Sequence, residues 1–164
     1  MIQSKSRSKR VQSGLATVEF AVTLPFLLLV IAISGEIGYV MYQQTLLSKT
    51  IETGGRYISV NATSGTGLVD ISAQDLLDTR NVILYGNKAG IGQPIISDLS
   101  PLNINVTCTY GTQNGHCVKN WNVTPITVQA NFTYTPVLGD LFDNVTGFNL
   151  FPVPLSAITI VESI

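Results

Sequence analysis

Residues 14–34 read GLATVEFAVTLPFLLLVIAIS, and this apolar stretch decides how the chain folds. The twenty residues from Leu15 to Ser34 contain one charged side chain, Glu19. A helix rises about 1.5 Å per residue, so this stretch would span roughly 30 Å, the thickness of a bilayer's hydrocarbon core. The stretch therefore predicts a transmembrane helix. A carboxylate at its mouth is costly, which indicates that Glu19 has a function.

The N-terminal tail predicts how that helix is oriented. Its first ten residues contain no acid, and they carry four bases: Lys5, Arg7, Lys9 and Arg10. Basic flanks of a membrane helix stay cytoplasmic, so the N-terminus is expected inside and the chain after about Tyr42 outside. We expect a basic leader (1–14), a transmembrane helix (15–42) and an extracytoplasmic domain (43–164).

Two simpler interpretations of the apolar stretch stay open. One is a plain single-pass anchor without processing, and the other is a secretory signal peptide cut near Ile33-Ser34-Gly35. The polar lead before the apolar run is long for a signal peptide, and Glu19 lies at the start of that run. Ile33 is also bulky for the outer cleavage position, so the signal peptide is disfavoured.

The helical pattern continues beyond Gly35 to about Tyr57. Spacings of three and four form one stripe, made of Ile37, Val40, Met41, Gln44, Leu47, Ile51, Gly54 and Ile58. The opposite face holds Gln43, Ser48, Lys49 and Glu52. We expect one helix of about 40 residues. The C-terminal domain would cover one part of its apolar stripe, and other helices would cover another part. Gly35, Gly38, Gly54 and Gly55 leave room for other helices to approach closely. The pair Gly54-Gly55 also indicates a weak point or hinge.

The outer domain is expected to be α+β. Ser72 and Asp75 fit a capping box that opens a helix ending near Tyr85, with Gly86 as its stop. Alternating apolar residues predict strands at 103–110, 126–134 and 156–161. Residues 61–70, 89–102 and 135–154 are expected to be loops, the last with one helical turn at 138–142. An antiparallel sheet of three or four strands would then be covered on one face by the long helix.

Cys108 and Cys117 are the only cysteines of the chain. In an extracytoplasmic compartment, an even pair at this spacing predicts a disulfide. A metal site that also used His116 would have two cysteines and one histidine but no fourth ligand, so it is disfavoured.

The chain offers little for catalysis. It has one histidine, no glycine-rich phosphate loop and no Gly-x-Ser-x-Gly or His-Glu-x-x-His motif, and its carboxylates are scattered. From Leu15 onward five basic and ten acidic residues leave the exported part mildly acidic. We therefore expect no enzyme activity, cofactor, metal or small-molecule substrate, and no binding to nucleic acid.

The order of several motifs resembles TadE/TadF-like minor pseudopilins of the Tad (tight adherence, Flp-type) pilus system. The motifs are the basic tail with Gly14, residues 15–20, Leu24-Pro25, residues 51–57, residues 80–87, residues 126–136 and residues 155–162. The departures are Gly54-Gly55, where the family usually has alanine among its small residues, and an acid-poor outer domain rich in Asn and Thr.

The resemblance implies a type IV pilin-like precursor in the inner (cytoplasmic) membrane. A prepilin peptidase would cut between Gly14 and Leu15, and Glu19 would contact the N-terminal amine of a neighbouring subunit during assembly. The implied partners are the peptidase, a major Flp-type pilin and a second minor pseudopilin, in an extracellular pilus used for adherence. The alternative is a membrane-anchored extracytoplasmic binding module with no pilus role, which needs neither cleavage nor Glu19.

Overall fold

The computed structural model describes residues 8–62, 69–113, 116–117, 124–136, 139, 147 and 152–162, with side chains from Gly14 onward. The chain divides into two compact units, Met1–Tyr39 and Val40–Ile164. The second unit contains the sheet and most of the buried core.

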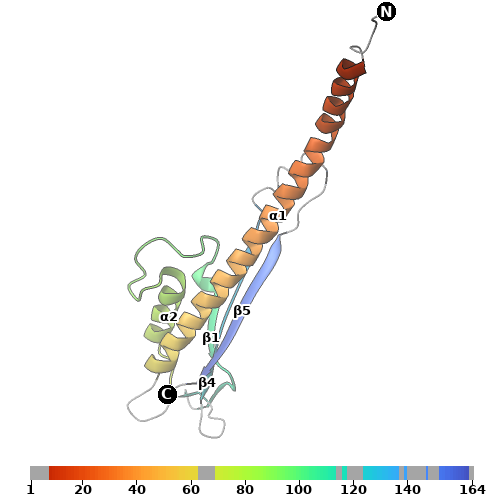
Figure 1. Cartoon of the computed structure of the whole chain (residues 1–164). Coiled ribbons are helices and arrows are strands. Elements are labelled where there is room, and N and C mark those ends of the chain that lie inside the picture. Colours follow the sequence, from red (N-terminus) through yellow and green to blue (C-terminus); the bar gives the residue numbers. More distant parts are fainter. Residues whose placement is uncertain are drawn as a thin grey trace, which may run out of the picture. The chain divides into compact units, whose positions relative to one another are not determined.

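Helix α1 runs from Ser8 to Asn61 and contains 54 residues (Figure 1). It begins within the basic leader and ends beyond the expected Tyr57. Residues 8–13 include no proline or glycine, so nothing in them stops the helix from extending toward the N-terminus. At the other end, the Asn61 side chain donates to the Tyr57 carbonyl at 2.7 Å, which satisfies one of the last free carbonyls.

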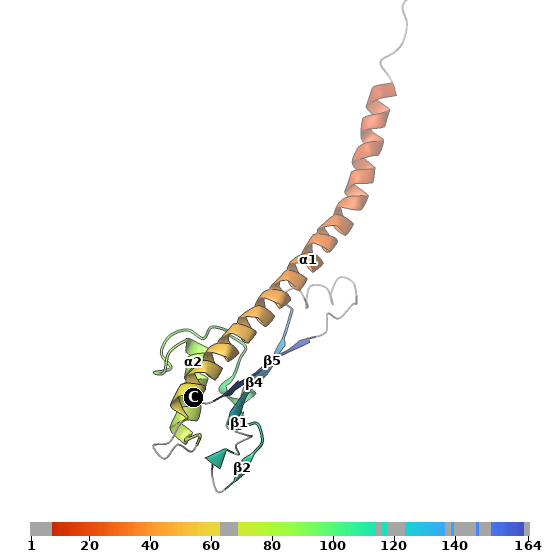
Figure 2. The ribbon, with the colours of Figure 1, turned by 60° about the horizontal axis from the view of Figure 1, so that its bottom comes forward.

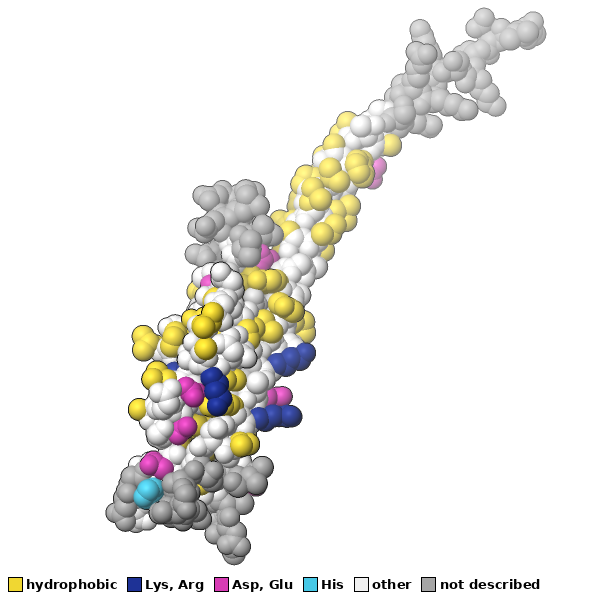
Figure 3. All heavy atoms as spheres, turned by 90° about the vertical axis from the view of Figure 1, so that its left-hand side faces the viewer, with side chains coloured by type: hydrophobic (Ala, Val, Ile, Leu, Met, Phe, Trp, Pro, Cys, Tyr) yellow, Lys and Arg dark blue, Asp and Glu magenta, His cyan; other side chains and the backbone are white. Residues whose placement is uncertain are grey.

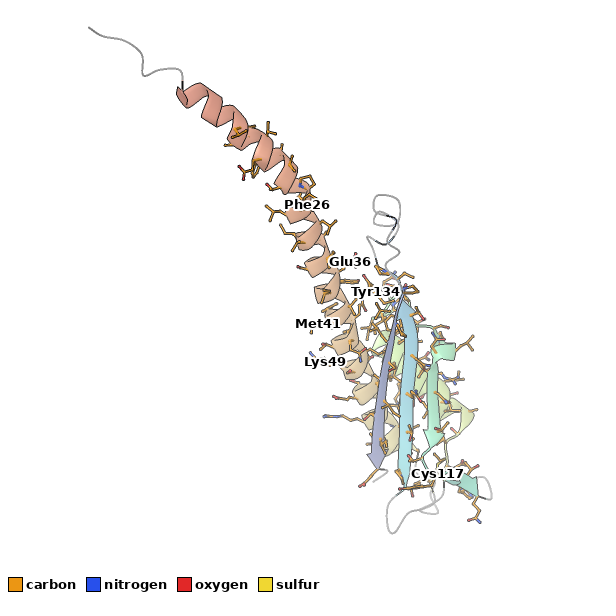
Figure 4. The ribbon with its side chains drawn as sticks, turned by 90° about the vertical axis from the view of Figure 1, so that its right-hand side faces the viewer. Phe26, Glu36, Met41, Lys49, Cys117 and Tyr134 are labelled. Carbon is orange, nitrogen blue, oxygen red and sulfur yellow. A yellow bond between two sulfur atoms is a disulfide. The ribbon has the colours of Figure 1, made fainter. Side chains whose placement is uncertain are left out.

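The C-terminal unit is α+β, as expected. Helix α2 (Ala73–Tyr85) and the single-turn helix η1 (Pro101–Asn103) precede a sheet of β1 (Ile104–Cys108), β4 (Pro125–Tyr134) and β5 (Val153–Glu162). The strand order is β1-β4-β5 and both pairings are antiparallel. The second part of α1 and helix α2 lie on one face of this sheet (Figures 1 and 4).

A separate hairpin replaces the possible fourth strand of the sheet. It consists of β2 (Thr112–Gln113) and β3 (His116–Cys117) and lies beyond the end of β1 (Figure 2). Loop 89–102 is confirmed except at Pro101–Asn103, where Ser100 caps the turn by accepting from Leu102 N–H at 3.4 Å. Of the helical turn expected at 138–142 only Gly139 is described, and it is helical; most of loop 61–70 lies outside the described residues.

The central strand β4 carries the core of the sheet. Its inward side chains are all buried: Ile126, Val128, Ala130, Phe132 and Tyr134. They face Leu47, Ile51 and Ile58 of α1, which are essentially inaccessible to solvent. This part of the apolar stripe is therefore confirmed. Ile37 and Met41 belong to the same sequence pattern and are 58% and 66% exposed, which agrees with the expectation that the C-terminal domain covers only part of the stripe.

The pair Gly54-Gly55 is a place of close approach and not the expected hinge. Helix α1 continues through both glycines, which are buried. A Cβ on Gly54 would clash with Ile83 Cγ1 of α2 and lie 2.6 Å from Ile83 Cδ1, and one on Gly55 would lie 2.8 Å from Thr159 Cγ2 of β5. Carbon atoms do not tolerate such distances. The absence of two side chains therefore lets α1 pack against α2 and β5 at once.

Helix α2 has the ends that its sequence predicts. The Ser72 side chain accepts from Asp75 N–H at 3.1 Å, and Asp75 accepts from Ser72 N–H at 3.1 Å. At the other end Gly86 adopts a φ of 72°, a left-handed conformation that suits glycine. The capping box and the stop are both confirmed.

Tyr57 joins α1 to α2. Its hydroxyl donates to Asp78 Oδ2 at 3.1 Å, while Gln74 Nε2 donates to Asp78 Oδ1 at 2.6 Å. Lys88 Nζ lies 4.9 Å from the centre of the Tyr57 ring. Hydrogen bonding to Tyr57 raises the pKa of Lys88, with attraction from Asp78 and Asp75 adding to the shift.

The substitution Gly54→Ala is expected to destabilise the C-terminal unit by up to about 2 kcal/mol. Overpacking against fully buried Ile83 costs roughly 1–3 kcal/mol, and better helix propensity returns about 1 kcal/mol. Denaturant unfolding of the detergent-solubilised chain, followed by near-UV circular dichroism, measures the change.

Gly38→Ala is the matched control, because a Cβ there would meet no atom within 4 Å. In an Ile83→Ala background, which lacks both Cγ1 and Cδ1, the cost of Gly54→Ala should fall. An equal cost in both backgrounds would contradict the proposed contact.

Candidate functional site

Gly14 and Leu15 lie on the exposed surface of α1. A Cβ on Gly14 would meet no atom within 4 Å, and the Leu15 side chain is 73% exposed. The fold therefore has no steric need for glycine at position 14. If this position requires a glycine, the requirement comes from a molecule that binds here.

Glu19 follows one and a half turns later on the same helix. Its backbone carbonyl accepts from Thr23 Oγ1 at 3.1 Å. Its carboxylate is exposed and makes no hydrogen bond or ion pair with any described residue. In an apolar environment an unpaired carboxylate is unfavourable. The described residues of this chain supply no such partner for Glu19.

The helix around these residues is long and apolar enough to cross a membrane. Its most apolar 18-residue window has a mean hydropathy of 2.3 and none of that window is buried. Large apolar side chains are exposed all around it, among them Val18, Phe20, Val22, Phe26, Leu27, Leu28, Val30 and Ile31. A helix that is apolar on every side is typical of a membrane span. Pro25 lies inside it, and the nearby Thr23 and Ser34 hydroxyls donate to carbonyls of the preceding turn.

Cys108 and Cys117 form a disulfide, with 5.3 Å between their Cα atoms. The bond joins the end of β1 to β3, and Cys117 N–H donates to the Val69 carbonyl at 2.9 Å. Because each sulfur is bonded to the other, neither is a thiolate ligand, which removes the alternative metal site with His116. Among the described residues no group of three His, Cys, Asp or Glu side chains is placed to hold a metal ion.

A shallow hollow of about 360 Å³ lies beside the disulfide. Its lining is mainly apolar and consists of Ile71, Leu76, Val106, Thr107, Cys108, Gly111 and Thr112. None of these lining residues is acidic or basic.

Arg56 is an exposed residue of α1 that the sequence pattern did not place on the outer face of the helix. The pattern identified Lys49 and Glu52 on the outer face of α1, and Arg56 continues that face one turn later. Its spacing of four residues from Glu52 is the signal that identifies it. All three side chains are exposed.

Comparison with known proteins gives one match. Residues 14–56 match the family model described as TadE-like protein. The match confirms the predicted resemblance over the junction and helix α1, and it begins at Gly14. No curated protein and no solved structure matches the chain.

Replacing both cysteines by serine is expected to lower the free energy of unfolding by about 2–3 kcal/mol, because the bond closes a short loop. Urea unfolding of the wild type with and without a reductant, beside the double variant, measures the loss. Reductant should destabilise the wild type by the same amount and leave the double variant unchanged. Alkylation of either cysteine in unreduced, denatured wild type would show that the bond is absent.

Proposed function

We propose that this chain is a pilin-like minor subunit, a pseudopilin, of a Tad/Flp-type pilus, and that it acts by assembly and not by catalysis. The observation that carries the proposal is the TadE-like match over residues 14–56, which includes Gly14, Leu15, Glu19 and the apolar helix. The chain would be anchored in the cytoplasmic membrane with its N-terminus inside. The parts would be a leader (1–14), a transmembrane helix (15–42) and an outer domain (43–164).

In this proposal a prepilin peptidase cuts between Gly14 and Leu15. Gly14 is exposed and the fold leaves room for a side chain there, so a preference for glycine would belong to the peptidase. The helical backbone at Gly14 has a further consequence. A protease active site needs access to the peptide carbonyl, and glycine lowers the cost of unwinding the helix locally by about 1 kcal/mol relative to alanine.

Glu19 would then act after the cut. The new amine at Leu15 and the Glu19 carboxylate would carry opposite charges, and the carboxylate has no partner among the described residues of its own chain. Pairing the Glu19 carboxylate of one subunit with the Leu15 amine of the next would remove the cost of two isolated charges in an apolar setting. The partners would be a major Flp-type pilin and a second minor pseudopilin.

Co-expression with a prepilin peptidase tests the cut. Gly14→Leu should leave the chain at its uncut size on a gel, because a bulky residue blocks the peptidase site. The control Gly35→Leu, also at a position with open space around its Cβ, should be cut like the wild type. A wild-type chain that keeps its full size beside active peptidase would favour the anchored binding module.

Glu19→Ala and Glu19→Gln test assembly separately from cutting. Both should be cut at the wild-type rate, and both should reduce the amount of chain in sheared pili at least tenfold, because neither side chain pairs with an amine as a carboxylate does. Immunoblots of sheared pili and of membranes measure the two fractions. Wild-type incorporation of Glu19→Ala would contradict the assembly role.

A further inference from the structure

The outer face of α1 carries three charged side chains on successive turns. Lys49, Glu52 and Arg56 are all exposed, and their spacings of three and four place them on one side of the helix. We call this set the charged stripe. Figure 4 shows Lys49 on the side of α1 that points away from the sheet, and Figure 3 shows basic and acidic side chains alternating along this helix.

The charges of the stripe are unused within the chain. None of the three side chains makes an ion pair or a hydrogen bond with a described residue. Glu52 and Arg56 stand at a spacing that permits an ion pair, yet the pair is not formed. The stripe is therefore available to a partner with a complementary order of charges.

Along the stripe the charges are positive, negative and positive. This order favours some shifts of two parallel helices along their axes and disfavours others. In register, each residue faces its own copy, so all three contacts bring like charges together. With one copy shifted by about one turn, roughly 5 Å, Lys49 of one chain faces Glu52 of the other, and Glu52 faces Arg56. A shift of two turns brings Lys49 against Arg56, which is again repulsive.

We propose that the charged stripe is a docking surface for a second copy of this chain, displaced along the helix axis by about one turn. The parallel orientation rests on the proposed function, because two chains anchored in one membrane enter it in the same direction. Copies at equal depth repel through the stripe, and a copy moved outward by about 5 Å is attracted. Such a contact is heterologous and does not close on itself, so it can be repeated along a filament.

Two opposite charge variants test the docking. Glu52→Lys makes the stripe uniformly positive, and Lys49→Glu combined with Arg56→Glu makes it uniformly negative. Each variant alone in vesicles should give roughly 2- to 30-fold less chain–chain cross-linking than wild type, since each exposed pair contributes modestly. Mixing the two variants should restore cross-linking, and salt should weaken it in the wild type.

Asp98→Lys is the matched control, because Asp98 is exposed on a loop outside the charged stripe and has no partner among the described residues. It should cross-link like the wild type. Equal cross-linking by the wild type and both stripe variants would overturn the proposal, and so would a failure of the mixture to recover.

Introduced cysteines test the displacement. The native cysteines are bonded to each other, so Met41→Cys and Thr45→Cys, both exposed and uncharged, give clean reporters one turn apart. In mixed vesicles the displaced arrangement predicts more 41–45 disulfides than 41–41 or 45–45 disulfides. Predominance of the like pairs would overturn the one-turn displacement.

Carbonate extraction of the same vesicles separates the two possible failures. A chain released by carbonate would contradict the membrane anchor and with it the proposed function. A chain that stays in the membrane but cross-links in register would overturn only this inference. Charge-sensitive cross-linking in host membranes to a different protein, with none between copies, would overturn the choice of a second copy as partner.

Discussion

The structure depends on the burial of one side of α1 against the sheet and α2. Leu47, Ile51 and Ile58 fill the space above β4, and Gly54-Gly55 leave the gap that lets two other elements approach the helix. The same helix is apolar on every side nearer its N-terminus, where no such cover is found among the described residues. The part of the helix nearer the N-terminus is therefore suited to an apolar environment, and the later part is suited to packing in a protein core.

The residues of the N-terminal junction have no comparable role in the fold. Gly14 fills no tight space, and the Glu19 carboxylate pairs with nothing among the described residues. The fold does not need these residues, yet the family match begins at Gly14. The most direct explanation is that they contact other molecules. The peptidase and a neighbouring subunit supply those molecules in the proposed function. The unpaired charges of the stripe extend the same reasoning to the aqueous part of α1.

Local sequence signals predicted much of this fold. Ser72, Asp75 and Gly86 determine the ends of α2 through hydrogen bonds and backbone conformation within a few residues, and β4 alternates because one face is buried. The sequence indicated a close approach at Gly54-Gly55, but it did not show that the approaching residues are Ile83 and Thr159, because both are distant in sequence. The sequence indicated that the C-terminal domain covers only part of the apolar stripe, but periodicity does not show where that cover ends, so it did not predict that Met41 is exposed. In the proposed function the partners of Gly14 and Glu19 belong to other chains, and a single sequence does not identify them.

The N-terminus of the chain in its native membrane tests the central claim most directly. Intact mass and N-terminal sequencing of the membrane-extracted protein would reveal whether the leader is removed. The account predicts a chain that begins at Leu15, with residues 1–14 absent. A membrane-bound chain that still begins at Met1, in cells with an active prepilin peptidase, would contradict it.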